Sequence, residues 1–102
     1  MKTLYEGEKR NVGALVSRRS GAGAIALVSP ERRILDANKN LVAGFDWAAA
    51  VWDSGTSKIF ALFDSTVGAL SAVGVYYVQL RGTVGAERYV IQIAVKLVDL
   101  GP

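Results

Sequence analysis

The sequence predicts an all-β fold, a β-sandwich of about seven antiparallel strands. Turn-forming residues recur about every 8–12 positions, and short runs rich in valine, isoleucine, leucine and aromatic residues separate them. The longest runs alternate apolar and polar residues with a period of two, which is typical of strands with one buried face. The expected strands cover residues 11–17, 23–29, 32–36, 41–52, 58–64, 74–83 and 88–98.

Length and composition fit one globular domain. The chain has 102 residues, of which 51% are hydrophobic and 21% charged. The sequence leaves open whether residues 1–10 form a flexible N-terminal segment in front of a sandwich over 11–100. The polar amino-terminal residues do not resemble a secretory signal, and no run of about 18 apolar residues occurs. We therefore expect a soluble protein made in a cytoplasm.

The chain contains neither cysteine nor histidine. A disulfide framework, a thiolate nucleophile and a cysteine zinc site are therefore excluded. The commonest general base and the commonest transition-metal ligand are also missing. These absences favour a protein that is not an enzyme and holds no cofactor or metal.

Charge is distributed unevenly along the chain. Residues 1–40 hold eight basic and four acidic residues, whereas residues 41–102 hold four basic and five acidic ones. Such a bias is compatible with a face that meets phosphates or an acidic partner. We prefer a simpler explanation, in which the basic residues lie on exposed edge strands, where they block unwanted pairing.

The clearest pattern is a terminal hairpin over 74–98. Tyr76, Val78 and Leu80 share one face of its first strand, and Tyr77 and Arg81 share the other. In the second strand, Ile91, Ile93, Val95 and Leu97 alternate with Val90, Gln92, Ala94, Lys96 and Val98. A glycine between the strands, Gly85, suits the positive φ of a tight connection.

The segment FDWAAAVWDSG, residues 45–55, is ambiguous. Its three consecutive alanines favour a helix. We favour a strand, because only about nine residues separate Gly44 from the next turn, and helices are usually longer than that. As a strand it places Phe45, Trp47, Ala49 and Val51 on one face.

Several motifs fail when tested. DANKN at 36–40 resembles the start of a calcium loop, but the sixth and twelfth positions are Leu41 and Trp47, so a turn is expected. SGAGA at 20–24 lacks the spacing and the lysine of a phosphate-binding loop. The carboxylates of Asp46, Asp53 and Asp64 are interpreted as turn residues rather than a catalytic pair.

Exposed aromatic and basic residues are the remaining candidates for a site. Trp52 and Tyr77 are expected on outward faces, and Tyr5 and Tyr89 are also candidates for exposure. The candidate interaction surface consists of Trp52, Tyr77, Arg81, Tyr89 and Lys96. Such residues anchor protein interfaces and also stack on sugars or bases.

From about Ser20 to Val98 the chain resembles the small immunoglobulin-like β-sandwich structural proteins of tailed bacteriophages and prophages. The resemblance rests on RILDANKNLVAG, DWAAAVWDSG, IFALFDST and GVYYVQLRGTVGAERYVIQIAVKLV, in this order. It places Tyr76 at the tyrosine-corner position of an immunoglobulin-like strand, and Val78 where a disulfide-bonded domain carries cysteine.

The resemblance implies a structural or assembly module of a virion or tail that acts through protein–protein contacts. The expected partners are other structural proteins or further copies of the chain, in a virion or in the cytoplasm; a membrane or nucleic acid is not expected. The alternative is a β-sandwich that binds carbohydrate or a cell surface. That alternative requires the candidate aromatic residues to gather on one exposed patch.

Overall fold

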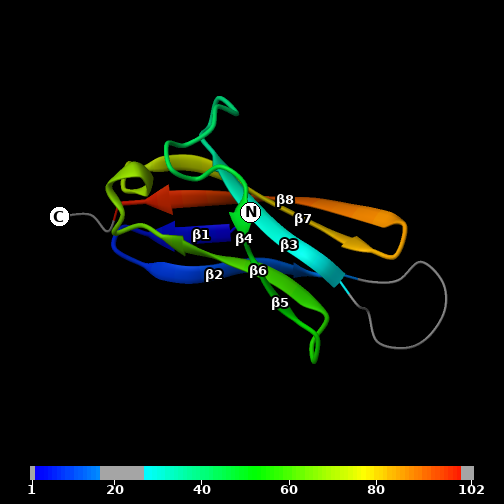
Figure 1. Ribbon diagram of the computed structural model, residues 1–102. Helices are drawn as coiled ribbons and strands as arrows, with labels where there is room; N and C mark the ends of the chain where they lie inside the picture. The colour runs from blue at the N-terminus through cyan, green and yellow to red at the C-terminus, as the bar shows by residue number, and fades with distance from the viewer. Residues whose placement is uncertain (1, 17–26, 100–102) are drawn as a thin grey trace.

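The chain folds into two β-sheets that pack face to face, as the computed structural model of residues 2–16 and 27–99 shows (Figure 1). In chain order the elements are β1 (Lys2–Tyr5), β2 (Lys9–Leu15), β3 (Leu27–Leu35), β4 (Ala48–Ala49), β5 (Val51–Asp53), β6 (Lys58–Asp64), the 3₁₀ turn η1 (Gly68–Leu70), β7 (Gly74–Val84) and β8 (Glu87–Val98). The prediction of an all-β sandwich is confirmed, with eight strands in the described part of the chain.

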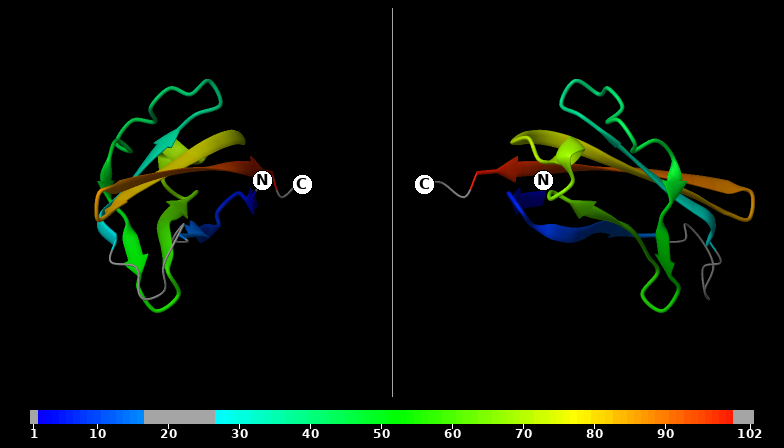
Figure 2. Two further views of the ribbon diagram at one scale, coloured as in Figure 1. Left: turned by 90° about the vertical axis from the view of Figure 1, so that its right-hand side faces the viewer. Right: turned by 60° about the vertical axis from the view of Figure 1, so that its left-hand side comes forward.

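One sheet has the strand order β1-β8-β7-β3-β4, and the other has the order β2-β6-β5. The two layers can be followed in Figure 2. Neighbouring strands run antiparallel except β1, which pairs parallel to β8 from Lys2–Val95 to Tyr5–Val98. The prediction of a wholly antiparallel sandwich is therefore wrong for β1. The sequence leaves the structure of residues 1–10 open; residues 2–5 and 9–10 are parts of the strands of the sandwich.

The predicted terminal hairpin is confirmed. β7 and β8 stay in unbroken register from the Gly74–Leu97 pair to the Val84–Glu87 pair. The connection consists of two residues, and the first of them, Gly85, has a φ of 59°. This left-handed conformation suits the tight hairpin turn, because glycine adopts it without steric cost.

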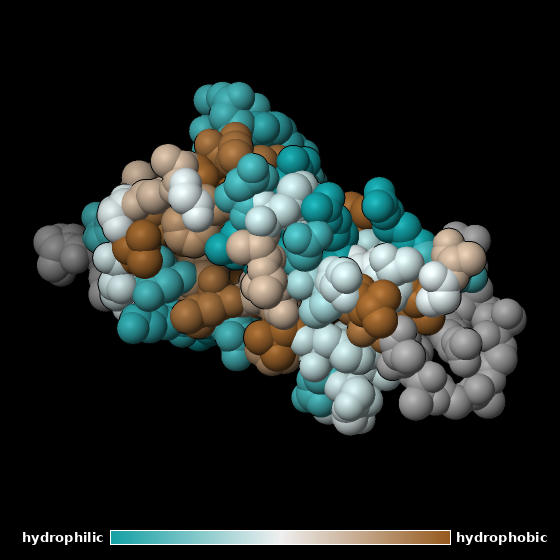
Figure 3. Space-filling model, viewed as in Figure 1, coloured by the Kyte–Doolittle hydropathy of each residue, from teal (hydrophilic) through white to brown (hydrophobic). Residues whose placement is uncertain are grey.

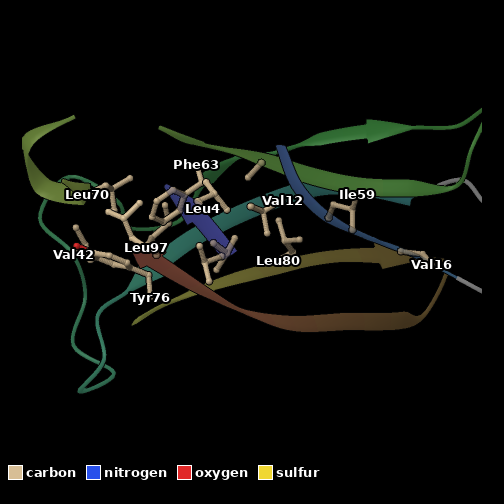
Figure 4. Packing of buried hydrophobic residues seen from close by; sticks show 14 of the residues in the cluster. Leu4, Val12, Val16, Val42, Ile59, Phe63, Leu70, Tyr76, Leu80 and Leu97 are labelled. Atoms are coloured by element: carbon tan, nitrogen blue, oxygen red, sulfur yellow. The ribbon is translucent and has the colours of Figure 1, made fainter. Parts of the chain in front are cut away.

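The core lies between the two sheets, where side chains from both layers point toward each other (Figure 4). Phe63 of β6 is completely buried and meets Tyr76 of β7 edge to face, with ring centroids 5.4 Å apart. Other members come from every strand except the short β4 and β5, and Trp52 of β5 packs against the cluster. The buried side chains of the cluster are Leu4, Val12, Val16, Leu27, Ile34, Val42, Ile59, Ala61, Phe63, Leu70, Tyr76, Val78, Leu80, Val95 and Leu97.

Tyr76 ties the start of β7 to the segment before it. Its hydroxyl group donates a 2.7 Å hydrogen bond to the backbone oxygen of Ala72, four residues earlier. Burial, with a smaller contribution from the negative charge of Asp36, raises the pKa of Tyr76, so the phenol is neutral and can donate this bond. The hydroxyl therefore fixes the chain where η1 leads into β7.

We predict that Tyr76→Phe lowers the free energy of unfolding by about 0.5–1.5 kcal/mol, because the carbonyl of Ala72 loses its donor. Tyr77→Phe is the matched control, since Tyr77 is the next residue along β7 and lies on the outer face. Urea unfolding of both variants measures the difference. Equal losses in the two variants contradict a specific role for the Tyr76 hydroxyl.

One strand replaces two of the predicted ones. β3 runs through the predicted break between 23–29 and 32–36 by way of a bulge, visible as a register shift between Val28 and Glu31. Ser29 in this bulge has a φ of 53° and is followed by Pro30. The turn-like Ser-Pro pair thus marks a local irregularity inside a strand. Positions 23–26 and SGAGA at 20–24 lie outside the described residues.

The prediction of one continuous strand over 41–52 is wrong, whereas the preference for strand over helix in this segment is confirmed. Leu41 forms an isolated bridge with Leu35, and the chain then turns at Gly44, whose φ is 83°. β4 and β5 follow as two short strands in different sheets, and neither is helical. Phe45 packs against the core, so it does not share a face with Trp47, which lies on the outer face of β3 and β7.

The turn predicted for DANKN is confirmed. One carboxylate oxygen of Asp36, Oδ1, accepts the backbone N–H groups of Asn38 and Asn40 at 2.9 and 3.0 Å. Lys39 has a φ of 65°, a left-handed conformation within this tight turn. The turn projects from the body of the sandwich (Figure 2), and it places Lys39 above the outer face of β7 and β8.

Candidate interaction surfaces

The outer face of the five-stranded sheet carries most of the predicted site residues, together with others that were not predicted. Strand register places Glu31 beside Arg81, Arg33 beside Gln79, and Gln79 beside Gln92. Directly paired residues of neighbouring strands share a face. We call this surface the basic face and define it by the basic residues Arg33, Lys39, Arg81, Arg88 and Lys96, the acid Glu31, and the side chains of Trp47, Tyr77, Gln79 and Gln92.

Trp47 lies against two guanidinium groups of the basic face. The Cζ atom of Arg81 is 3.8 Å from the centroid of the Trp47 ring, and that of Arg33 is 4.8 Å from it. At these distances both cations are attracted to the electron-rich ring. Arg81 also makes a 2.9 Å ion pair with Glu31, through Nη2 and Oε1, so it is fixed on two sides.

A chain of hydrogen bonds continues across the sheet from this cluster. Nε of Arg33 donates to Oε1 of Gln79 at 2.5 Å, and Nε2 of Gln79 donates to Oε1 of Gln92 at 2.9 Å. The Nζ atom of Lys39 donates to the same Gln92 oxygen at 3.4 Å and lies 4.1 Å from the Tyr77 ring centroid. The polar side chains of β3, β7 and β8 thus form one connected layer.

The structure brings together three of the five predicted candidates. Tyr77, Arg81 and Lys96 lie on the basic face. Trp52 belongs to the other sheet and is half-buried against the core, so its predicted outward position is wrong. Tyr89 is also half-buried against the core, and its hydroxyl donates to Oε2 of Glu87 at 2.8 Å.

Sequence reasoning missed Arg33, Lys39, Trp47 and Arg88 as members of this surface. A partial signal exists for Arg88, because the alternation of β8 continues from Val90 to it. The position of Arg33 on this face can be inferred only when the pairing of β3 with β7 is known. Trp47 and Lys39 come from irregular segments, whose direction no periodic pattern describes.

The outer face of the three-stranded sheet combines charged side chains of β2 and β6 with several large apolar ones. Leu15, Val51 and Leu62 have exposed fractions of 69%, 51% and 52%, and Phe60 is half-buried beside them. Register pairs Phe60 with Gly13 on one side and with Val51 on the other. We call Leu15, Val51, Phe60 and Leu62 the apolar face. In the view of Figure 3, hydrophobic residues reach the surface over the part of the molecule formed by β2, β5 and β6.

The three aspartates tested as a catalytic pair each stabilise a local turn. Asp53 accepts the N–H of Gly55 at 3.0 Å, and Asp46 accepts the N–H of Trp47 at 2.7 Å. Asp64 accepts the hydroxyl and the N–H of Thr66, and these two bonds, more than the ion pair with Lys9, lower its pKa. Within residues 2–16 and 27–99, no group of three or more acidic side chains is placed to hold a metal ion.

No helix in the described ranges has the length and apolar character needed to cross a membrane.

No protein-family model matches the chain, and neither does any curated protein sequence.

Proposed function

We propose that this protein is a non-enzymatic structural module that assembles through protein–protein contacts, with a second copy of itself as the partner of the apolar face. The observation that carries the proposal is the exposure of Leu15, Val51 and Leu62 around Phe60. The outward face of an antiparallel sheet is commonly polar. Neighbouring large apolar side chains on a surface mark an interaction site.

A second copy is the simplest partner for such a face, because an apolar surface is complementary to another apolar surface. A two-fold axis over the central Phe60 places the same residues of both copies in contact, as in the dimers that dominate soluble oligomers. Four side chains form a small interface compared with the roughly 20–30 residues per partner of a typical stable complex. We therefore expect a dissociation constant on the order of 100 µM, which repeated contacts in an assembly strengthen.

We further infer that the sandwich is immunoglobulin-like. The order β2-β6-β5 corresponds to strands B, E and D of that fold, and β8-β7-β3-β4 corresponds to G, F, C and C′. The hydrogen bond from Tyr76 to Ala72 corresponds to the tyrosine corner before strand F. The setting that we propose, a virion or tail of a tailed phage or prophage, rests on the sequence resemblance.

A carbohydrate-binding surface finds less support. It requires Trp52, Tyr77 and Tyr89 to gather on one exposed patch, but they lie in two sheets and on different faces. Tyr77 in addition has the Lys39 ammonium group over its ring, where a sugar would stack.

We predict that the wild-type chain self-associates reversibly and that Leu62→Glu abolishes this association. The added carboxylate must be desolvated when the apolar face is covered, which opposes the contact. Val90→Glu is the matched control, because Val90 is 62% exposed and lies on a strand of the other sheet. Sedimentation equilibrium from about 10 µM to about 1 mM measures the association.

The association is expected to persist at about 1 M salt, because contacts between apolar side chains are not screened. A wild-type chain that stays monomeric at every concentration overturns the proposed self-assembly. Equal loss in Leu62→Glu and Val90→Glu also overturns it, since the apolar face is then not the site of contact.

A further inference from the structure

The positive charge of the molecule is concentrated on the basic face. Among the outward strand positions of β3, β7 and β8, four are basic and only Glu31 is acidic. Lys39 adds a fifth cation from the turn above Gln92. These residues give the face a formal charge of +4, whereas the formal net charge of the whole chain is +3. The rest of the chain therefore carries no net positive charge. A surface of this kind attracts an anionic partner.

The cations follow the length of the β7–β8 hairpin. Arg88 pairs with Thr83 near the hairpin turn, and Lys96 pairs with Val75 at the far end. The four two-residue steps between these pairs correspond to about 26 Å at about 3.3 Å per residue. Arg81, Arg33 and Lys39 lie between the two ends. An extended segment of about eight residues has the same length.

Several of these cations are held in place before any partner arrives. Arg81 is fixed by Glu31 and Trp47, Arg33 by Gln79 and Trp47, and Lys39 by Gln92 and Tyr77. A guanidinium group has five N–H donors, and the bonds described for Arg33 use one of them. Ordering side chains before binding reduces the entropy lost on association.

The aromatic rings distinguish between two kinds of anionic partner. Single-stranded nucleic acids bind by stacking bases on open aromatic faces. Here Trp47 has two guanidinium groups over its ring, and Tyr77 has an ammonium group over its own. A cation that already lies over a ring competes with a base for that ring, whereas a carboxylate can bind the same cations without disturbing the rings. These contacts therefore favour carboxylates.

We propose that the basic face binds an extended, acidic segment of a protein partner, about eight residues long, whose carboxylates meet the cations from Arg88 to Lys96. This inference deepens the proposed function by giving the chemistry of a second contact. It involves the opposite sheet from the apolar face, so each proposal can fail without the other.

The test is fluorescence-anisotropy titration of a labelled eight-residue peptide of alternating glutamate and serine. The protein is the Leu62→Glu variant, which keeps self-association out of the measurement. The face variant adds Arg88→Glu and Lys96→Glu, both exposed residues. The control variant adds Lys9→Glu and Lys58→Glu, which change the net charge equally but lie on the other sheet. An oligothymidylate of eight nucleotides is the competing probe.

We expect the peptide to bind, and the face variant to weaken binding at least about tenfold more than the control variant, since reversed charges repel the carboxylates. No binding at about 1 mM protein in low salt overturns the proposal. Equal weakening by the two variants also overturns it, because net charge alone then explains the attraction. If the oligothymidylate binds more tightly than the peptide, and Trp47→Ala abolishes this binding, the proposal is overturned. The partner of the basic face is then a nucleic acid and not an acidic protein segment.

Discussion

Replacing Phe63 by alanine is expected to lower the free energy of unfolding by about 3–5 kcal/mol, the range typical of a phenylalanine removed from a core. Phe63 is completely buried and contributes its ring to the contact with Tyr76 between the two sheets. The substitution removes the buried apolar surface and leaves a cavity that the paired strands cannot readily close. A domain of this size has a total stability of about 5–15 kcal/mol, so the substitution removes a large fraction of it.

Phe60→Ala is the matched control, because Phe60 lies on the same strand but on the opposite, half-buried face. Guanidinium chloride unfolding of both variants measures the difference, and we expect Phe60→Ala to lose clearly less than Phe63→Ala. Equal losses contradict the assignment of Phe63 to the core and of Phe60 to the outer face. An unchanged slope with denaturant in both variants shows that the folded states are comparable.

The second large effect is expected for Gly13→Ala. A Cβ atom at position 13 overlaps the backbone oxygen of Ile59 and lies 2.9 Å from the Cα atom of Phe60. Neither atom belongs to a flexible side-chain end, so β2 and β6 must move apart to accept the methyl group. We expect a loss of about 2–3 kcal/mol, as for other overpacked sites.

Gly68→Ala is the control for this prediction, because a Cβ atom there meets no heavy atom within 4 Å. We expect its stability to change by no more than about 0.5 kcal/mol. Thermal unfolding of the two variants provides the measurement. If Gly13→Ala is as stable as Gly68→Ala, the close approach of β2 to β6 at this position is wrong.

The terminal hairpin could be predicted because its information is local. The period-two pattern extends over both strands, and Gly85 provides the backbone conformation that the connection requires. In this pattern Tyr89 lies two residues before Ile91 and therefore on the same, inward face. The structure also places Tyr89 against the core. The alternation of β8 therefore already argues against an exposed Tyr89.

The middle of the chain could not be predicted in the same way, because its direction depends on long-range contacts. The N–H of Ile34 donates to the carbonyl of Phe45, and Gly44 has a positive φ, so the chain reverses before Trp47. Trp52 faces the core because β5 pairs with β6 and not with β4. The basic face depends on the pairing of β3 with β7, which sequence periodicity does not encode.

The parallel pairing of β1 with β8 has a consequence for the order in which the chain folds. β7 and β8 are joined by two residues and can pair within microseconds. The Lys2–Val95 pair instead closes a loop of about ninety residues, so the entropic barrier places β1 among the last strands to dock. During synthesis, β1 leaves the ribosome before β8 and has no partner in the sheet until β8 follows. Between the formation of the β7–β8 hairpin and the docking of β1, the free edge of β8 is open to pairing with another chain, and the docking of β1 ends that exposure.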